Sequence, residues 1–111
     1  MNNRKQLIRK YKERQVTGGV YRILNTQNGK FLLGSGIDLK GDRNRFDFSV
    51  ATGSCVQMKL QKDWDTFGPK AFKFEVLDEL KKEPEQDIAA FREELELFEE
   101  MWRERLSGEE Y

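Results

Sequence analysis

The sequence predicts an α/β (α+β) fold in which helices flank a small three-stranded antiparallel sheet. The strongest local indication is Asn28-Gly29, which lies between two apolar runs, because Asn-Gly suits the two-residue turn of a β-hairpin. Later, residues 72 to 77 alternate with the period of two that a strand with one buried face requires. The segments between and after these have apolar residues at helical spacing. The expected order is two strands, two helices, a strand and a helix.

The hairpin strands are expected over residues 19 to 25 and 30 to 36. With Asn28-Gly29 as the turn, Ile23 should pair with Gly34. Side chains alternate along a strand. One face should therefore carry Tyr21, Ile23, Leu32 and Gly34.

Helices are expected before and after the hairpin. Residues 3 to 15 indicate a basic helix with a thin apolar stripe. Asp38 can cap a helix over 39 to 51, and Ser54 can cap a second helix through about residue 66. Spacing by four predicts that the second helix faces the core with Val56, Leu60 and Trp64.

The last two elements are a strand over 71 to 78 and a long helix over 85 to 106. Pro84 lies near the first turn of that helix, where proline is tolerated. The apolar face of this helix comprises Ile88, Phe91, Leu95, Phe98, Trp102 and Leu106. Glu99 lies about 20° beyond the edge of this face, whereas Glu93, Glu96, Glu100 and Glu104 point away from it. We expect Trp64 and Trp102 to pack on the sheet.

The composition limits the class of protein. A chain of 111 residues predicts one domain, and the absence of histidine excludes Ser-His and Cys-His catalytic pairs. The lone Cys55 excludes an internal disulfide and predicts a reducing, cytoplasmic location. No apolar run reaches the ~20 residues that span a bilayer, so no membrane association is expected.

The formal net charge is zero, but the charges are unevenly distributed. Residues 1 to 45 contain 11 Lys/Arg and 3 acids, whereas residues 83 to 111 contain 3 Arg and 11 acids. This asymmetry indicates a polyanion partner on the basic side. Alternatively, both segments are solvated helix faces that pair with each other.

Several motifs appear in order. Gly19-Val20-Tyr21 is followed by Leu32-Leu33-Gly34, Arg45 lies early on the next helix, and Glu99 lies three residues before Trp102. Together these motifs resemble the GIY-YIG nuclease superfamily over about residues 18 to 106. The resemblance implies a GIY-YIG-like domain over 18 to 106, preceded by a basic helical segment 1 to 17 and followed by a tail 107 to 111. It also implies a metal-dependent endonuclease that uses Mg²⁺ or Mn²⁺ to hydrolyse DNA phosphodiester bonds.

The resemblance assigns three catalytic roles. Tyr21 would be a general base, Arg45 a phosphate clamp and Glu99 the metal ligand. The structural alternatives are a half-buried strand aromatic, a solvent-facing arginine and a boundary glutamate paired with a lysine. Nucleic-acid contacts, with DNA or alternatively RNA, are expected from Lys10, Lys12, Lys40, Arg43 and Arg45.

Three positions depart from the family pattern. Leu32 replaces a tyrosine, Ser49 replaces a histidine or tyrosine, and Cys55 lies where relatives often carry histidine. Leucine can neither donate nor accept a hydrogen bond. The alternative function is therefore a degenerate, non-catalytic GIY-YIG module that binds nucleic acid or a protein partner, for example in transcriptional regulation.

Overall fold

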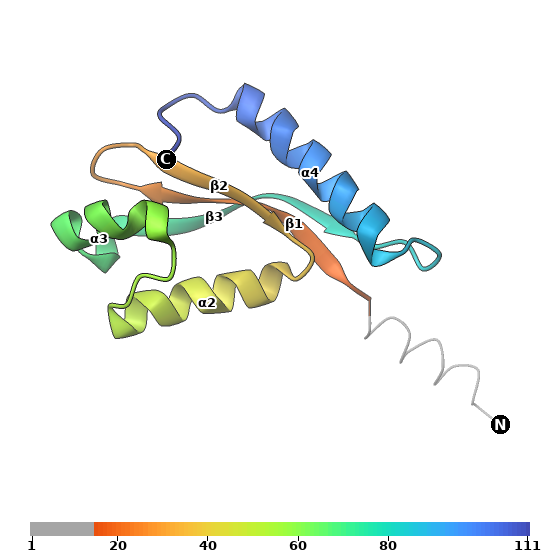
Figure 1. Cartoon of the computed structure of the whole chain (residues 1–111), viewed down its shortest axis with the longest axis horizontal. Coiled ribbons are helices and arrows are strands. Elements are labelled where there is room, and N and C mark those ends of the chain that lie inside the picture. The colour runs from red at the N-terminus through yellow and green to blue at the C-terminus, as the bar shows by residue number, and fades with distance from the viewer. Residues whose placement is uncertain (1–14) are drawn as a thin grey trace.

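The structure, a computed structural model, describes residues 15 to 111 and confirms the predicted α+β fold (Figure 1). A three-stranded antiparallel sheet has the strand order β2-β1-β3. The predicted basic helix over residues 3 to 15 falls almost entirely outside the described residues. Within residues 15 to 111, no helix is both long enough and apolar enough to cross a bilayer. The elements are β1 (Thr17–Asn25), β2 (Phe31–Gly36), α2 (Leu39–Thr52), η1 (Met58–Leu60), α3 (Gln61–Phe67), η2 (Pro69–Ala71), β3 (Phe72–Lys81) and α4 (Ile88–Arg105).

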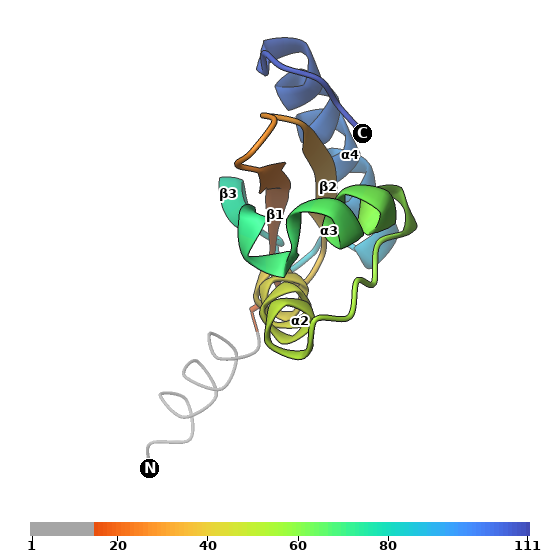
Figure 2. The same cartoon turned by 90° about the vertical axis from the view of Figure 1, so that its left-hand side faces the viewer.

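One face of the sheet packs against α4, as Figure 2 shows. Val20, Phe31 and Leu33 point to this face and are buried. Phe98 and Trp102 of α4 pack against them, which confirms the predicted position of Trp102.

The other face packs against α2 and α3. Ile23, Phe72 and Phe74 point to this side and are buried together with Leu60 and Trp64. The Trp64 ring stacks on Phe72 with their centroids 5.1 Å apart. Each face of the sheet therefore has its own apolar cluster, because side chains alternate along the central strand.

The predicted hairpin pairing is wrong by two residues. Ile23 lies opposite Leu32, and Tyr21 lies opposite Gly34. A shift of two residues leaves every side chain on the face that was predicted. Tyr21, Ile23, Leu32 and Gly34 consequently still share one face, and the phenol and the glycine are direct neighbours.

The hairpin loop explains this shift. A type I′ turn needs positive φ at both central residues, whereas only Gly29 of the Asn28-Gly29 pair has it, at 79°. The chain instead forms a longer loop, in which the Asn25 N–H donates to the Lys30 carbonyl at 2.8 Å. The Asn28 side chain accepts from the Lys30 N–H at 3.0 Å and so stabilises this loop.

Strand β3 contains a β-bulge that the alternation pattern did not predict. In β1, Val20 pairs with Asp78, but the next residue, Tyr21, pairs with Val76. Leu77 is the extra residue, so Leu77 and Asp78 both lie on the α4 side. Leu77 joins the apolar cluster there, and Asp78 accepts a hydrogen bond from the Trp102 indole at 3.2 Å. The alternation over residues 72 to 77 would place Val76 on the buried face with Phe72 and Phe74, but Val76 is 42% exposed.

The second predicted helix starts later than expected. Gly53 ends α2 in the left-handed conformation (φ 77°), and residues 54 to 57 form a loop instead of a helical turn capped by Ser54. Helical structure resumes at η1, and Val56 is 64% exposed. Only Leu60 and Trp64 of the predicted apolar face are buried.

The long helix also starts later, at Ile88 instead of residue 85. The Asp87 side chain accepts a hydrogen bond from the Ala90 N–H at 2.7 Å and caps the helix. Pro84 lies in the turn that precedes this cap. The cap residue sets the start of α4 because it satisfies an N–H group that the first turn leaves without a partner.

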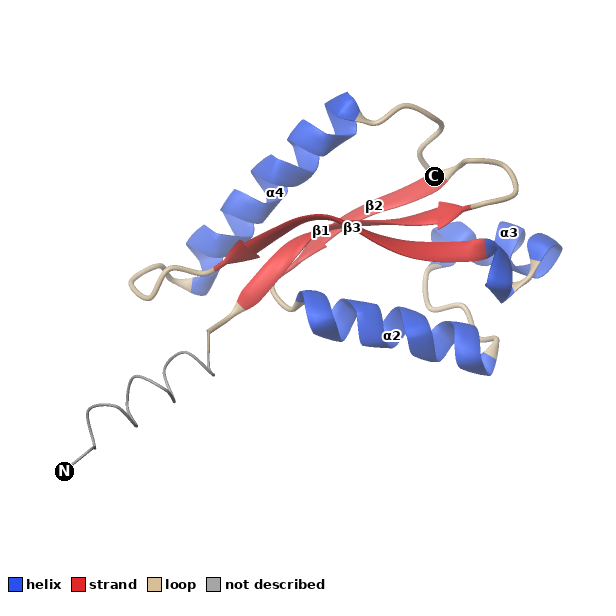
Figure 3. Cartoon of the chain, turned by 180° about the vertical axis from the view of Figure 1, so that it is seen from behind, coloured by secondary structure: helices blue, strands red, loops and turns tan. Residues whose placement is uncertain are grey.

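Residues 109 to 111 run beside the start of β2, near the hairpin loop (Figure 3). The Phe31 N–H donates to the Glu109 carbonyl at 3.0 Å, and the Tyr111 N–H donates to the Phe31 carbonyl at 2.8 Å. The Tyr111 hydroxyl donates to Asp63 at 2.6 Å and accepts from the buried Asn25 amide at 3.1 Å. This segment therefore joins the hairpin to α3.

Candidate active site

The phenol of Tyr21 lies across the neighbouring strand β2. A Cβ atom at Gly34 would lie only 2.9 Å from the Tyr21 Cζ and hydroxyl oxygen, so a glycine is required for this close approach. On its other side the Tyr21 ring stacks on Phe74, with a centroid separation of 4.7 Å. The two neighbours hold the ring in one position.

Arg45 and Asp42 come from the first half of α2. The Asp38 side chain caps this helix by accepting from the Gly41 N–H at 3.0 Å. One turn later, Asp42 forms an ion pair with Arg45. The Arg45 side chain is 66% exposed, so a solvent-borne anion can reach the guanidinium.

Asp42 is a site residue that the sequence analysis missed. One of its carboxylate oxygens binds Arg45, whereas Oδ2 is buried and receives no hydrogen bond from the described residues. A Cβ atom at Gly36 would collide with this oxygen. The signal in the sequence was an acid three residues before Arg45, a spacing that places both on one helix face.

Glu99 lies on α4, and its side chain is 21% exposed. Its nearest cation is Arg103, with 3.7 Å between Oε2 and Nη2. Arg103 also forms ion pairs with Glu100 and Glu110, and its Nε lies 2.9 Å from Glu110 Oε1. The structural alternative was a boundary glutamate paired with a lysine, whereas the structure pairs Glu99 with an arginine one turn further along the helix.

Electrostatic effects connect the three predicted catalytic residues. Burial raises the pKa of the Tyr21 phenol above 10, and Asp42 and Glu99 raise it further while Arg45 opposes the shift. The phenol is therefore protonated at neutral pH. Asp42 and Arg45 act on it from α2, and Glu99 acts on it from α4, so the three elements converge on one group.

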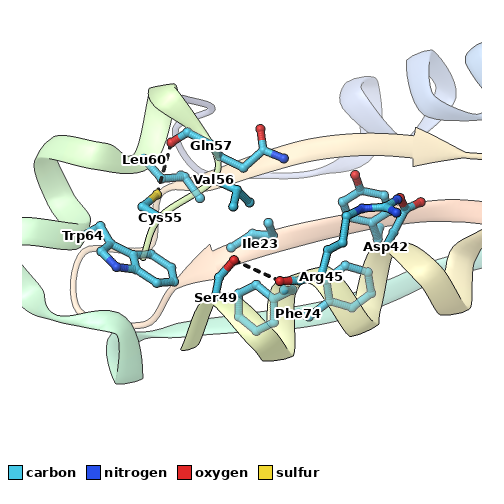
Figure 4. A pocket seen from close by; sticks show the side chains of 12 residues that line it. Ile23, Asp42, Arg45, Ser49, Cys55, Val56, Gln57, Leu60, Trp64 and Phe74 are labelled. Atoms are coloured by element: carbon cyan, nitrogen blue, oxygen red, sulfur yellow. Dashed lines mark hydrogen bonds and ion pairs between the residues drawn. The ribbon is translucent and has the colours of Figure 1, made fainter. Parts of the chain in front are cut away.

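A cavity of about 260 Å³ lies along the sheet, and Tyr21 is among the residues that line it. Asp42 and Arg45 line one end, and Trp64 lines the other (Figure 4). A second cavity of about 310 Å³ shares Arg45 and reaches Glu96 on α4. Glu96 is exposed, as expected, and borders this second cavity. Glu99 lines neither of these two cavities and acts on Tyr21 from beside them.

The predicted nucleic-acid residues are not all gathered at one place. Lys40 and Arg43 line a separate hollow between α2 and β3, and the Arg43 guanidinium lies 5.9 Å from the Phe74 ring centroid. The predicted Lys10 and Lys12 fall outside the described residues.

A divalent cation would find few carboxylates here. Within residues 15 to 111 there is no group of three or more acidic, Cys or His side chains that could enclose a metal ion. Magnesium commonly binds one or two carboxylates and keeps several waters. Glu99, whose side chain is 21% exposed, offers one carboxylate to such a hydrated ion, whereas the buried Asp42 Oδ2 is closed to solvent.

No protein-family model matches the sequence, and a comparison with curated proteins finds no match. Two solved structures are similar. The first is the catalytic domain of the intron endonuclease I-TevI in a mutant form, at 24% identity and a TM-score of 0.58, covering 81% of this chain and 84% of that chain. The second is the catalytic domain of the homing endonuclease I-TevI, at 25% identity and a TM-score of 0.56, covering 80% of this chain and 87% of that chain. These likenesses establish the fold.

Proposed function

We propose that this chain, which has the fold of the catalytic domain of a GIY-YIG nuclease, is a metal-dependent endonuclease that hydrolyses DNA phosphodiester bonds. The observation that supports this function best is that Tyr21 of β1 and Arg45 of α2 line one cavity. Glu99 of α4 contributes to the raised pKa of the Tyr21 phenol.

Arg45 would bind the phosphate. Its guanidinium presents a planar set of N–H donors that matches phosphate oxygens. In the free chain Asp42 occupies part of this donor set, so phosphate must displace or share that carboxylate. As charge develops on the phosphoryl oxygens, the guanidinium stabilises it.

Tyr21 would act as the general base that accepts a proton from the attacking water. Once ionised, the phenolate accepts a proton from water, whose oxygen forms the new bond to phosphorus while the bridging oxygen leaves with its electron pair. The raised pKa means that the free chain holds the phenol in its neutral form. A nearby cation is therefore needed to shift the phenol toward ionisation.

Glu99 would hold the divalent cation through its partly exposed carboxylate, with water and the substrate phosphate as the other ligands. A bound Mg²⁺ or Mn²⁺ supplies positive charge that stabilises both the ionised nucleophile and the phosphoryl group.

The test is cleavage of supercoiled and branched DNA by the purified chain with Mg²⁺ or Mn²⁺. We expect Arg45→Ala and Glu99→Ala to lower the rate by at least about 100-fold, the size typical for one electrostatic donor. Glu93→Ala is the matched control, because it removes an exposed acid from the same helix. Equal loss in Glu93→Ala and Glu99→Ala would contradict the assigned role.

A second function has its own support in the structure. Arg45 and Glu99 are both paired internally, with Asp42 and Arg103, and Leu32 replaces a polar side chain of the family pattern. These features favour a module that binds nucleic acid without cutting it. DNA binding without cleavage at any metal concentration would select this function over the endonuclease.

A further inference from the structure

The 260 Å³ cavity beside Arg45 has a largely apolar wall. Ile23, Leu60 and Phe74 are buried apolar side chains in its wall, and Trp64 lies at the end remote from Arg45. Pockets of this kind, apolar with a few polar groups, suit a flat organic ligand better than a phosphate or a hydrated ion.

Polar groups lie at specific points of the same cavity. The buried Ser49 hydroxyl donates to the Arg45 carbonyl at 2.9 Å and retains its lone pairs as acceptors. The Gln57 side chain extends from the loop after α2 toward Arg45 (Figure 4). Its amide provides both a donor and an acceptor, the combination that reads the edge of a base.

The cavity and the phosphate clamp are continuous. Arg45 lines the cavity at one end, so a nucleotide whose phosphate contacts the guanidinium would have its base next to the apolar wall. We infer that this cavity is a binding site for one nucleobase that lies outside the helical stack, next to the phosphate held by Arg45. This inference rests on the nucleic-acid binding in the proposed function.

A preference among substrates follows. A base in an intact duplex is paired and stacked, and extruding it costs a few kcal/mol, whereas a bulged, mismatched or single-stranded base enters at lower cost. Nucleic acid with an unpaired base beside the bound phosphate should therefore bind more tightly than a perfect duplex of equal length and charge.

The primary test compares three duplexes, with Ca²⁺ replacing Mg²⁺ to limit cleavage. They differ at one position, which carries a bulged 2-aminopurine, a bulged abasic sugar or a paired base. We expect the bulged base to bind about tenfold more tightly than the abasic bulge, in the range that stacking of one base contributes. The two bulges have the same backbone and the same number of phosphates, so the charge is matched and the comparison tests the contribution of the base.

Cys55 gives an independent readout, because it lines the cavity and is the chain's single cysteine. Alkylation of Cys55 by iodoacetamide is followed at mildly alkaline pH, because burial raises the pKa of this thiol. The alkylation rate should fall about fivefold or more when the bulged-base duplex is bound, but not when the abasic duplex is bound. Cys55→Trp should fill the cavity and abolish the preference. Met58→Trp is the control, because Met58 lies just beyond the same loop at 93% exposure and does not line the cavity.

The outcomes separate the two proposals. If none of the three duplexes binds, nucleic-acid binding itself fails. If the bulged base and the abasic bulge bind equally, or if the bulged base binds tightly while Cys55 stays fully reactive, the nucleobase site is refuted and the proposed function stands. The alkylation result comes from the unsubstituted chain, so it decides the question even where Cys55→Trp does not fold.

Discussion

The close approach between Tyr21 and Gly34 leads to a quantitative prediction. In Gly34→Ala the new Cβ would lie 2.9 Å from the Tyr21 Cζ and hydroxyl oxygen, so the ring must move away from its stacked position on Phe74. Overpacking of this kind costs about 1–3 kcal/mol. The backbone of Gly34 does not have positive φ, so alanine can adopt its conformation. Replacing glycine therefore also stabilises the fold by about 0.4–1 kcal/mol, because it reduces the conformational entropy of the unfolded chain.

A double-mutant cycle isolates the contact. Gly34→Ala should lower the free energy of unfolding by about 0.5–2 kcal/mol when Tyr21 is present. It should be neutral or stabilising when Tyr21→Ala has removed the ring. The coupling energy should then be about 1–3 kcal/mol, measured by urea unfolding with the fluorescence of Trp64 and Trp102. A coupling energy below about 0.5 kcal/mol would show that the ring does not occupy this position. The displaced phenol should also reduce DNA cleavage.

Three further predictions concern charges around the site. The hydrogen bond from the Tyr111 hydroxyl is the main cause of the lowered pKa of Asp63. The ionised Asp63 carboxylate therefore stabilises the fold at pH values above its ordinary pKa of 3.8, and this contribution is lost as the pH falls through the pKa of the folded state. Tyr111→Phe should therefore weaken the decrease in the free energy of unfolding below about pH 4, and an unchanged acid limb in urea titrations would contradict this. Arg103→Met should free Glu99 and tighten Mn²⁺ binding by about threefold to tenfold in calorimetry, whereas equal affinity would show that the ion pair does not compete with metal. Asp42→Asn should release the guanidinium that it pairs with and tighten DNA binding by a few-fold at low salt, with the gain disappearing at high salt.

The sequence predicted those features of the fold that depend on local periodicity. The strands, the shared face of Tyr21 and Gly34, and the burial of Trp64 follow from spacings of two or four residues. The exact register did not follow, because the hairpin loop is selected by hydrogen bonds of Asn25 and Asn28 that compete with the two-residue turn.

The sequence proposed site residues but could not describe their environment. The family resemblance placed Tyr21, Arg45 and Glu99 on neighbouring elements. It did not predict that Asp42 would pair with Arg45, or that burial would raise the pKa of the phenol. Those properties arise from distances between side chains of different elements, which depend on how the elements pack and not on any local pattern.

The bulge at Leu77 also affects how the sheet opens. It interrupts the hydrogen-bond ladder between β1 and β3 immediately before the pair of Tyr21 and Val76. Thr17 and Gly18 pair with β3 and lie outside the β1–β2 pairing, so they can fray while the pairs from Tyr21 onward remain closed. In native-state hydrogen exchange, the amides that hold the phenol should belong to the slower unit. Fraying where the chain enters the sheet at Thr17 would then leave the position of the Tyr21 hydroxyl unchanged.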